Sequence, residues 1–211
     1  MFSFLTGGVL MHKVKFGNMY WYILKKDSEK ILLCSRYEEK YLKPCNYSTS
    51  EDFFREVRRY MNVDFYDSKF SESDRKHILI VKNNYPDINY FTDELGYDRK
   101  RYEMKKEKDR VFPLKYDDVC NLSKRDLCDL CDSYESDYRL ILLPSSINSN
   151  QNIPAIYYYE PWNNNQKYKE CFEISNYKYE DICGFDYEDY SFYCKPCIWV
   201  DLKANLVYED R

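Results

Sequence analysis

Short stretches in which apolar and polar residues alternate run through much of the chain and predict a protein built mostly of strands. Aromatic and β-branched residues dominate Lys13–Lys25, and a second apolar stretch, Lys30–Arg36, follows the turn signal Asp27-Ser28. These two stretches predict a hairpin. Further strands are expected at Ile78–Val81, Val111–Leu114, Arg139–Leu143, Ile156–Tyr159, Lys169–Ile174 and Tyr193–Leu202.

Helical spacing is clearest after Thr49. Thr49 and Asp52 have the pattern of a capping box, which marks the start of a helix. Apolar residues then recur at helical intervals, at Phe53, Val57, Tyr60, Met61 and Phe65. A second capping box at Ser71–Asp74 predicts a short helical turn. Two more short helices are expected, at Tyr116–Leu122 and from Ser123 to Asp132.

Residues 83–109 show no clear periodicity and are expected to form a long surface loop. Short strands, two or three helices and long loops together predict the α+β class, with a small twisted antiparallel sheet. The 211 residues fit one domain with a sizeable core. We expect a weakly ordered leader at 1–12, a single α+β binding domain at 13–204 and a C-terminal tail at 205–211.

Composition and charge narrow the function classes. The longest apolar runs are far shorter than the roughly 20 residues of a membrane-spanning helix. No secretory signal is recognisable, so the nine cysteines are expected to be free thiols in a reducing cytoplasm. The net charge of −4 argues against binding of nucleic acid by the whole surface. We therefore expect a protein partner, with no direct nucleic acid, no membrane and no cofactor.

Several segments, taken in order, resemble a bacterial family of uncharacterised domains. These segments are Phe16–Leu24 (FGNMYWYIL), Ile31–Ser35, Arg55–Phe70 (REVRRYMNVDFYDSKF), Ser71–Asp74, Asp109–Leu114 and Lys195–Val200 (KPCIWV). The resemblance spans roughly residues 14–204. It implies a fold distantly similar to C-type-lectin-like and sulfatase-modifying-factor-like proteins, with close termini and long loops on one side. It implies no established activity.

The chain departs from this family where such folds usually bind ligands. The family's Trp-Leu-Arg-Ser-Pro segment corresponds to Arg139–Ser146, which has no tryptophan. The glycine-rich loop before the last strand is replaced by the acidic, tyrosine-rich residues 177–193. Fold analogy alone does not determine the function.

Two C-x-x-C pairs, Cys128/Cys131 and Cys194/Cys197, are the residues that would bind zinc if the protein had a metal site. The first pair has helical spacing, which indicates core packing. The second pair falls in a strand, where residues three apart face opposite sides. The chain has two histidines, His12 and His77, and neither lies in a recognisable nucleophile motif. No catalytic residue and no metal site are predicted.

Three groups of residues are candidates for partner binding. They are the aromatic and amide residues Tyr157, Tyr158, Tyr159, Trp162, Asn163 and Asn164; the acidic run Tyr179, Glu180, Asp181, Asp186, Tyr187, Glu188 and Asp189; and the basic residues Arg99, Lys100 and Arg101. Tyrosine supplies much contact area at little entropy cost, and this chain has 24 tyrosines.

These groups favour a non-enzymatic binding protein of a bacterium or its phage that engages a macromolecular partner. A sharper hypothesis is an inhibitor of a nucleic-acid-binding host defence nuclease, in which the acids imitate phosphates. The alternatives are a cysteine- or zinc-dependent enzyme and a small-ligand binder of the carbohydrate type.

Overall fold

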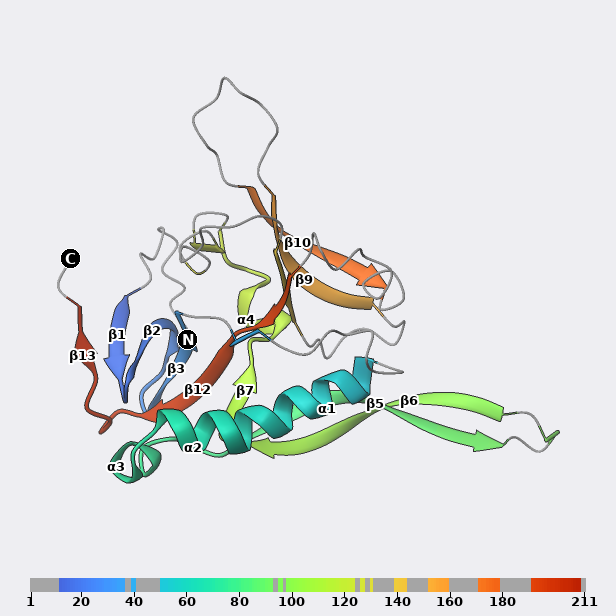
Figure 1. The fold of residues 1–211 in the computed structure, drawn as a ribbon, viewed down its shortest axis with the longest axis horizontal. Coiled ribbons are helices and arrows are strands. Elements are labelled where there is room, and N and C mark those ends of the chain that lie inside the picture. The colour runs from blue at the N-terminus through green and yellow to red at the C-terminus, as the bar shows by residue number, and fades with distance from the viewer. Residues whose placement is uncertain are drawn as a thin grey trace, which may run out of the picture.

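A large antiparallel sheet, a long helix and two smaller sheets make up the fold of the computed structural model (Figure 1). The structure describes residues 12–36, 39–40, 50–92, 95–96, 98–123, 126–127, 130, 139–143, 152–159, 171–178 and 191–209. The helices are α1 (Ser50–Tyr60), the π-helical turn η2 (Met61–Phe65), α2 (Tyr66–Lys69), α3 (Glu72–Arg75) and α4 (Tyr116–Val119). The strands are β1 (Lys13–Phe16), β2 (Met19–Lys26), β3 (Lys30–Ser35), β4 (Glu39–Lys40), β5 (Val81–Thr92), β6 (Asp98–Asp109), β7 (Val111–Pro113), β8 (Arg139–Leu142), β9 (Asn152–Tyr159), β10 (Cys171–Lys178), β11 (Ser191–Cys194), β12 (Pro196–Asp201) and β13 (Val207–Tyr208).

The large sheet has the strand order β13-β1-β2-β3-β12-β7 and is covered on both faces. Successive residues of β3 point to opposite sides of the sheet. Ile31 and Leu33 pack in one core with Phe54, Met61 and Phe65 of the helix. Leu32 and Cys34 pack in a second core, whose other members include Val119, Leu130 and Ile141. The continuous apolar run in β3 follows from this burial on both sides.

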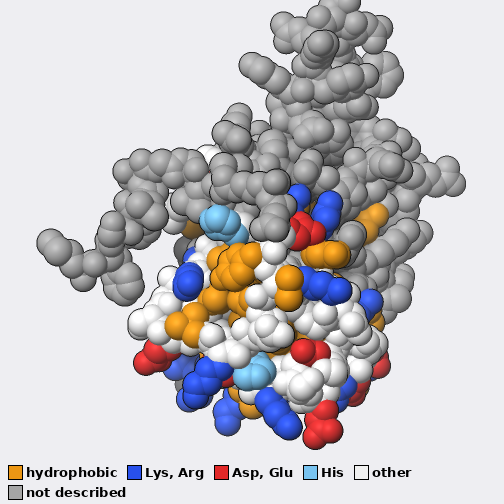
Figure 2. Space-filling view, turned by 90° about the vertical axis from the view of Figure 1, so that its left-hand side faces the viewer, with side chains coloured by type: hydrophobic (Ala, Val, Ile, Leu, Met, Phe, Trp, Pro, Cys, Tyr) orange, Lys and Arg blue, Asp and Glu red, His pale blue; other side chains and the backbone are white. Residues whose placement is uncertain are grey.

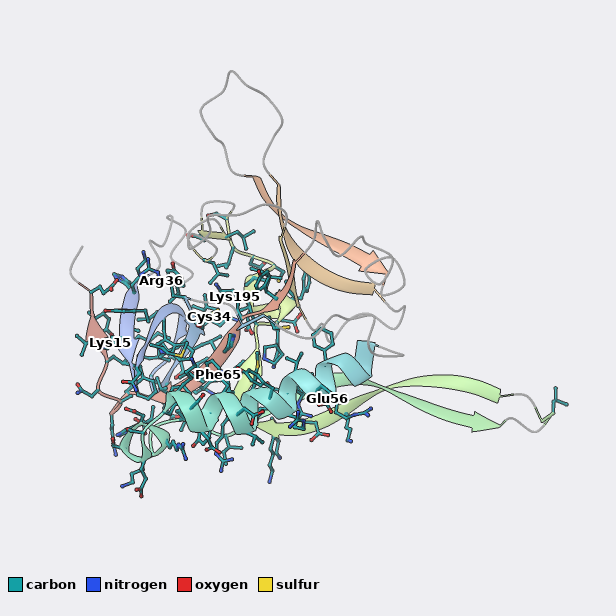
Figure 3. All side chains as sticks on the ribbon, in the orientation of Figure 1. Lys15, Cys34, Arg36, Glu56, Phe65 and Lys195 are labelled. Carbon is teal, nitrogen blue, oxygen red and sulfur yellow. The ribbon has the colours of Figure 1, made fainter. Side chains whose placement is uncertain are left out.

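The helix predicted after Thr49 is confirmed, and it continues from α1 through η2 into α2. Thr49 itself lies outside the described residues. Phe65 lies between the helix and the large sheet (Figure 3). The ring of Phe70, just after α2, lies 5.9 Å from the rings of Phe16 and Trp21 and 6.1 Å from that of Phe65. These aromatic contacts fix the end of the helix to β1 and β2.

The capping box expected at Ser71 is confirmed, and a second one forms at Ser123, where a helix was expected to begin. Ser71 accepts a hydrogen bond from the Asp74 amide, and the Asp74 side chain accepts one from the Ser71 amide. Ser123 and Asp126 make the same reciprocal pair. Both signals are local in sequence, so the pattern alone is enough to predict them.

Three predicted strands are only partly right. Lys13–Lys25 forms two strands instead of one, because Gly17 and Asn18 make a hairpin turn between the paired residues Phe16 and Met19. Ile78 makes an isolated bridge to Val200, and the next strand begins at Val81. The strand expected at Tyr193–Leu202 is broken at Lys195 into β11 and β12.

The prediction of a loop at residues 83–109 is wrong. This stretch forms most of β5 and β6, which pair in antiparallel register over their full length. The strands carry mostly polar residues, so the apolar periodicity that marks a half-buried strand is missing. The two strands form by pairing with each other, which the sequence pattern of either strand does not reveal.

The remaining strands form the sheet β10-β9-β8-β11-β4, in which β11 and β8 are parallel and the other pairs are antiparallel. The α+β class is therefore confirmed, but the described residues form three sheets where one small sheet was expected. Within the stretch expected as a tail, Val207 and Tyr208 pair with β1. The Glu209 amide also donates to the Lys13 carbonyl at 3.1 Å. None of the helices among the described residues is long and apolar enough to span a membrane.

Gly17 provides a test of the hairpin turn. Its φ is +60°, and a Cβ added there would lie 3.2 Å from both the Lys69 carbonyl oxygen and the Phe70 ring. Gly17→Ala should lower the free energy of unfolding by about 2–4 kcal/mol, because backbone strain adds to the steric conflict. Urea denaturation measures this.

The matched control is Gly96→Ala. Gly96 also has a positive φ, +81°, but an added Cβ would meet nothing within 4 Å. This variant should lose at most about 1–2 kcal/mol, from strain alone. Equal losses in the two variants would contradict a steric role for the contact with Phe70.

Candidate functional site

The carboxylate of Asp109, at the end of β6, is fully buried and surrounded by donors. Its Oδ1 accepts from Arg58 Nη2 at 2.7 Å, from Arg58 Nε at 3.1 Å and from Asn62 Nδ2 at 3.2 Å. Its Oδ2 accepts from Asn83 Nδ2 and from the Tyr85 hydroxyl, both at 2.9 Å. These five residues form what we call the anchor network. Five hydrogen bonds leave this carboxylate little capacity to accept from a substrate.

Three elements deliver these side chains. Arg58 in α1 and Asn62 in η2 lie one helical turn apart, and Asn83 and Tyr85 lie two residues apart in β5, so each pair shares a side of its element. Asn62 also binds the start of β7: its Nδ2 donates to the Val111 carbonyl at 2.8 Å and its Oδ1 accepts from the Arg110 amide at 2.8 Å. The network therefore ties the helix to both β5 and the β6–β7 junction.

Electrostatics keep the network in one protonation state. Burial lowers the pKa of Arg58, but the hydrogen bond and charge of Asp109 outweigh this and raise it overall. Burial, and then the charge of Asp109, raise the pKa of Tyr85 well above its ordinary value. The Arg58 guanidinium lies 4.6 Å from the centre of the Tyr85 ring. Arg58 thus stays charged and Tyr85 stays protonated at neutral pH.

Lys115 extends the network on the side of the second core. Its ammonium group donates to the Asn83 amide oxygen and lies 5.0 Å from the centre of the Phe112 ring. Burial lowers the pKa of Lys115, and the charge of Asp118 acts in the opposite direction. None of these residues has a buried side-chain nitrogen or oxygen without a hydrogen-bond partner, which suits a structural anchor better than a reactive centre.

The element that the network holds is a two-stranded arm, which we define as β5 and β6. Among the described residues these strands pair only with each other. Figure 1 shows the arm running under α1 and then projecting beyond the rest of the molecule. An isolated two-stranded hairpin is marginally stable in water. The anchor network at the base of the arm therefore sets its position.

The candidate residues singled out from the sequence lie in separate places. Arg99, Lys100 and Arg101 are in β6, at register positions opposite Phe91, Tyr90 and Asn89. Tyr157, Tyr158 and Tyr159 are in β9, which pairs with β10 on one side and with β8 on the other. The others are outside the described residues: Trp162, Asn163, Asn164, Tyr179, Glu180, Asp181, Asp186, Tyr187, Glu188 and Asp189.

The cysteine pair in the closing strands is split between the two cores. Cys194 packs on the helix side of the large sheet, and Cys197 packs on the opposite side, next to its cross-strand partner Cys34. One metal ion cannot reach both thiols of this pair. Burial raises the pKa of the Cys194 and Cys197 thiols, which keeps them protonated and unreactive.

Cys128 and Cys131 lie outside the described residues. Within the part of the chain that the structure describes, no three His, Cys, Asp or Glu side chains are grouped to hold a metal ion.

Lys195 and His77 also have structural positions. Lys195, at the break between β11 and β12, is buried, and its ammonium group donates to the Arg36 carbonyl at 3.2 Å. Figure 3 shows Lys195 near Cys34 and Arg36. His77 Nδ1 lies 3.1 Å from an Asp201 carboxylate oxygen, a contact that links the end of α3 to the end of β12.

An apolar surface lies at the end of the molecule opposite the arm. Figure 2 looks onto this end and shows hydrophobic side chains gathered among lysines and arginines. Leu202, Val207 and Tyr208 are the exposed large apolar residues near β13. This surface has no charge pattern that defines a partner, so the arm is the stronger candidate.

The sequence alone did not single out Arg58, Asn62, Asn83, Tyr85 or Asp109 as one site. Arg58 and Asp109 are 51 positions apart, and each belongs to a stretch rich in charged residues. The available signal was the alternation at positions 81–85. Val81, Asn83 and Tyr85 share one side of the strand, and the exposed residues Lys82 and Asn84 share the other. Such a short polar alternation does not by itself predict burial.

Comparison of the chain with protein-family models, with curated proteins and with solved structures found no match. The resemblance to a bacterial family of uncharacterised domains and to C-type-lectin-like folds therefore stays a prediction. The functional proposal rests on the geometry of the arm and its anchor.

The ion pair can be tested with Asp109→Asn. This change keeps the shape of the side chain but leaves Arg58 buried without its main counter-charge. The free energy of unfolding should fall by about 3–5 kcal/mol. In the control Glu107→Gln, the carboxylate removed is 28% exposed and lies 3.4 Å from Arg58, so the loss should stay below about 1 kcal/mol. Similar losses in both variants would contradict a special role for Asp109.

The raised pKa of Tyr85 predicts a pH effect with a definite sign. Above its ordinary value of 10.0 the unfolded chain loses the phenolic proton while the folded chain keeps it. The resulting stability is complete below pH 10 and falls as the pH rises further. In Tyr85→Phe the decline between pH 10 and 11 should be shallower by up to about 1.4 kcal/mol per pH unit.

Urea denaturation at a series of pH values measures this slope. Tyr208→Phe, at a residue that is 51% exposed, is the control and should keep the wild-type slope. A wild-type slope in Tyr85→Phe as well would show that the hydroxyl is not held protonated by the fold.

Proposed function

We propose that this chain is a non-enzymatic binding protein that engages a macromolecular partner, with the arm as its main contact element. The observation that carries the proposal is the anchor network, in which a fully buried carboxylate and five hydrogen bonds hold the base of a hairpin that contributes little to the core. Burial of an ion pair adds little net stability. The need to hold the arm in a fixed position explains why such a network is present.

The dimensions of the arm suit contact with a large partner. Twelve residues in each strand give a length of about 40 Å. A ribbon of this length presents enough surface for a stable interface, which needs about 800 Å² from each partner. A small ligand would need a concave site instead.

The enzyme alternative draws less support from the described residues. Cys194 and Cys197 lie on opposite faces of the large sheet, and their thiols are buried. The carboxylate of Asp109 is occupied by Arg58 and the neighbouring donors. The carbohydrate-type alternative has no specific observation in its favour.

The inhibitor hypothesis stays a prediction, because the acidic run on which it rests lies outside the described residues. In that hypothesis the acids imitate a nucleic-acid backbone in the basic channel of a host enzyme.

A capture experiment with a shortened arm tests the proposed function. Residues 86–104 are replaced by Asn-Gly, which joins the register partners Tyr85 and Lys105 through a two-residue turn and leaves the anchor network intact. Tagged wild-type and shortened proteins are incubated with nuclease-treated and untreated bacterial lysate. The wild type should retain a stoichiometric macromolecule that the shortened protein loses, while both unfold at the same urea concentration. Equal capture by both proteins would overturn the role of the arm.

A second variant in the same capture experiment tests the acidic run. It carries Glu180→Gln, Asp181→Asn, Asp186→Asn, Glu188→Gln and Asp189→Asn. If the acids imitate phosphates, this variant should lose a nuclease-resistant protein partner. Undiminished capture would sink the inhibitor hypothesis.

A further inference from the structure

The two faces of the arm differ in character. At its base, Asn83, Tyr85 and Asp109 are buried against the body, whereas Lys82, Asn84, Lys106 and Lys108 are exposed. Residues directly opposite in an antiparallel pair share a face, and alternate residues share a face along each strand. We call the alternate register positions that include these four exposed residues the outer face. Its register pairs are Lys82–Lys108, Asn84–Lys106, Pro86–Met104, Ile88–Tyr102 and Tyr90–Lys100.

The register segregates charge that is mixed in the sequence. The outer-face positions hold four lysines and no acid over these five pairs, and the first acid comes at the Thr92–Asp98 pair next to the tip. The other acids of the paired strands, Asp87, Glu103, Glu107 and Asp109, have the opposite parity. The arm has seven basic and five acidic residues, and the register places the excess of positive charge at the outer-face positions.

The acids at the base of the arm are already neutralised on their own side. Asp109 and Glu107 pair with Arg58, and Glu107 also lies 3.1 Å from Lys105. In the described structure no acid pairs with Lys82, Lys106 or Lys108. The positive potential of the outer face is thus left for a partner.

We infer that the outer face of the arm binds the phosphate backbone of a nucleic-acid duplex. This inference rests on the proposed function and names the partner class for the arm. Lysines spaced along a ribbon match a linear and evenly charged partner better than a compact acidic patch. A two-stranded ribbon also fits the major groove of DNA, which is about 12 Å wide.

This assignment departs from the expectation drawn from the net charge of −4. That expectation averaged the charge over the whole surface, whereas binding depends on the local field of one face. The outer-face positions also hold Asn84, Tyr90 and Tyr102, residue types that hydrogen-bond to phosphate or sugar groups.

The test is fluorescence anisotropy of a fluorescein-labelled 20-base-pair DNA duplex titrated with the full chain. Four lysine–phosphate contacts should reduce the affinity about 150-fold between 50 and 200 mM salt. The triple variant Lys82→Gln, Lys106→Gln and Lys108→Gln keeps one outer-face lysine, so its affinity should fall only about 3- to 4-fold over the same range. At 50 mM salt it should also bind more weakly than the wild type.

The matched control removes the same charge elsewhere. Lys15, Lys26 and Lys203 are exposed and lie outside the arm, and Figure 3 marks Lys15 at the far end of the molecule. The triple variant Lys15→Gln, Lys26→Gln and Lys203→Gln should keep the wild-type affinity and salt dependence. Equal weakening in both triple variants, or no binding of the duplex by the wild type at 50 mM salt, would overturn the inference.

A labelled poly-glutamate peptide separates this inference from the proposed function. Binding of the peptide through the outer-face lysines, without binding of the duplex, would assign the face to an acidic protein and overturn the nucleic-acid inference alone. If shortening the arm abolishes capture but the wild type does not bind the duplex, the nucleic-acid inference alone is again overturned. If shortening the arm also leaves capture unchanged, both the inference and the proposed function fail.

Discussion

The buried ion pair between Asp109 and Arg58 is the interaction on which the arrangement of this molecule depends. The ion pair joins the helix to the base of the arm, and Asn62 beside it binds strand β7, which lies at the edge of the large sheet. Desolvation of both charges is expensive, so the pair is tolerated only because Asn62, Asn83 and Tyr85 satisfy the remaining positions. Such a network specifies geometry more than it adds stability.

The large sheet supplies the rigid support for this network. Both of its faces are buried, one under α1 and η2 and the other under α4 and β8. Burial on both sides explains the continuous apolar runs in the strands. It also explains why cysteines three apart in the chain enter different cores and do not form one site.

The arm differs in composition from the rest of the molecule, which we call the body. The body holds the apolar cores, whereas β5 and β6 carry charged and aromatic residues on a ribbon that Figure 1 shows projecting outward. This strand pair is stabilised by the anchor network at its base and not by an apolar face along its whole length. Its side chains are therefore free to be selected for contact with another molecule.

The elements that depend on near neighbours could be predicted from the amino-acid pattern alone. Helical spacing of Val57, Met61 and Phe65 placed the helix, reciprocal Ser and Asp pairs placed the capping boxes, and apolar runs placed several strands. These signals are local because hydrogen bonds and burial repeat over a few residues.

Only the tertiary structure decided the pairing of β5 with β6, the burial of Asp109 and the segregation of lysines on the outer face. Each depends on residues far apart in the chain: Arg58 reaches Asp109 across 51 positions, and Lys82 faces Lys108. Which side of a polar strand is exposed depends on its register and on what packs against it. Local composition reveals neither the register nor the packing of a strand. For this reason the charged stretch from 98 to 110 had the appearance of a solvated loop.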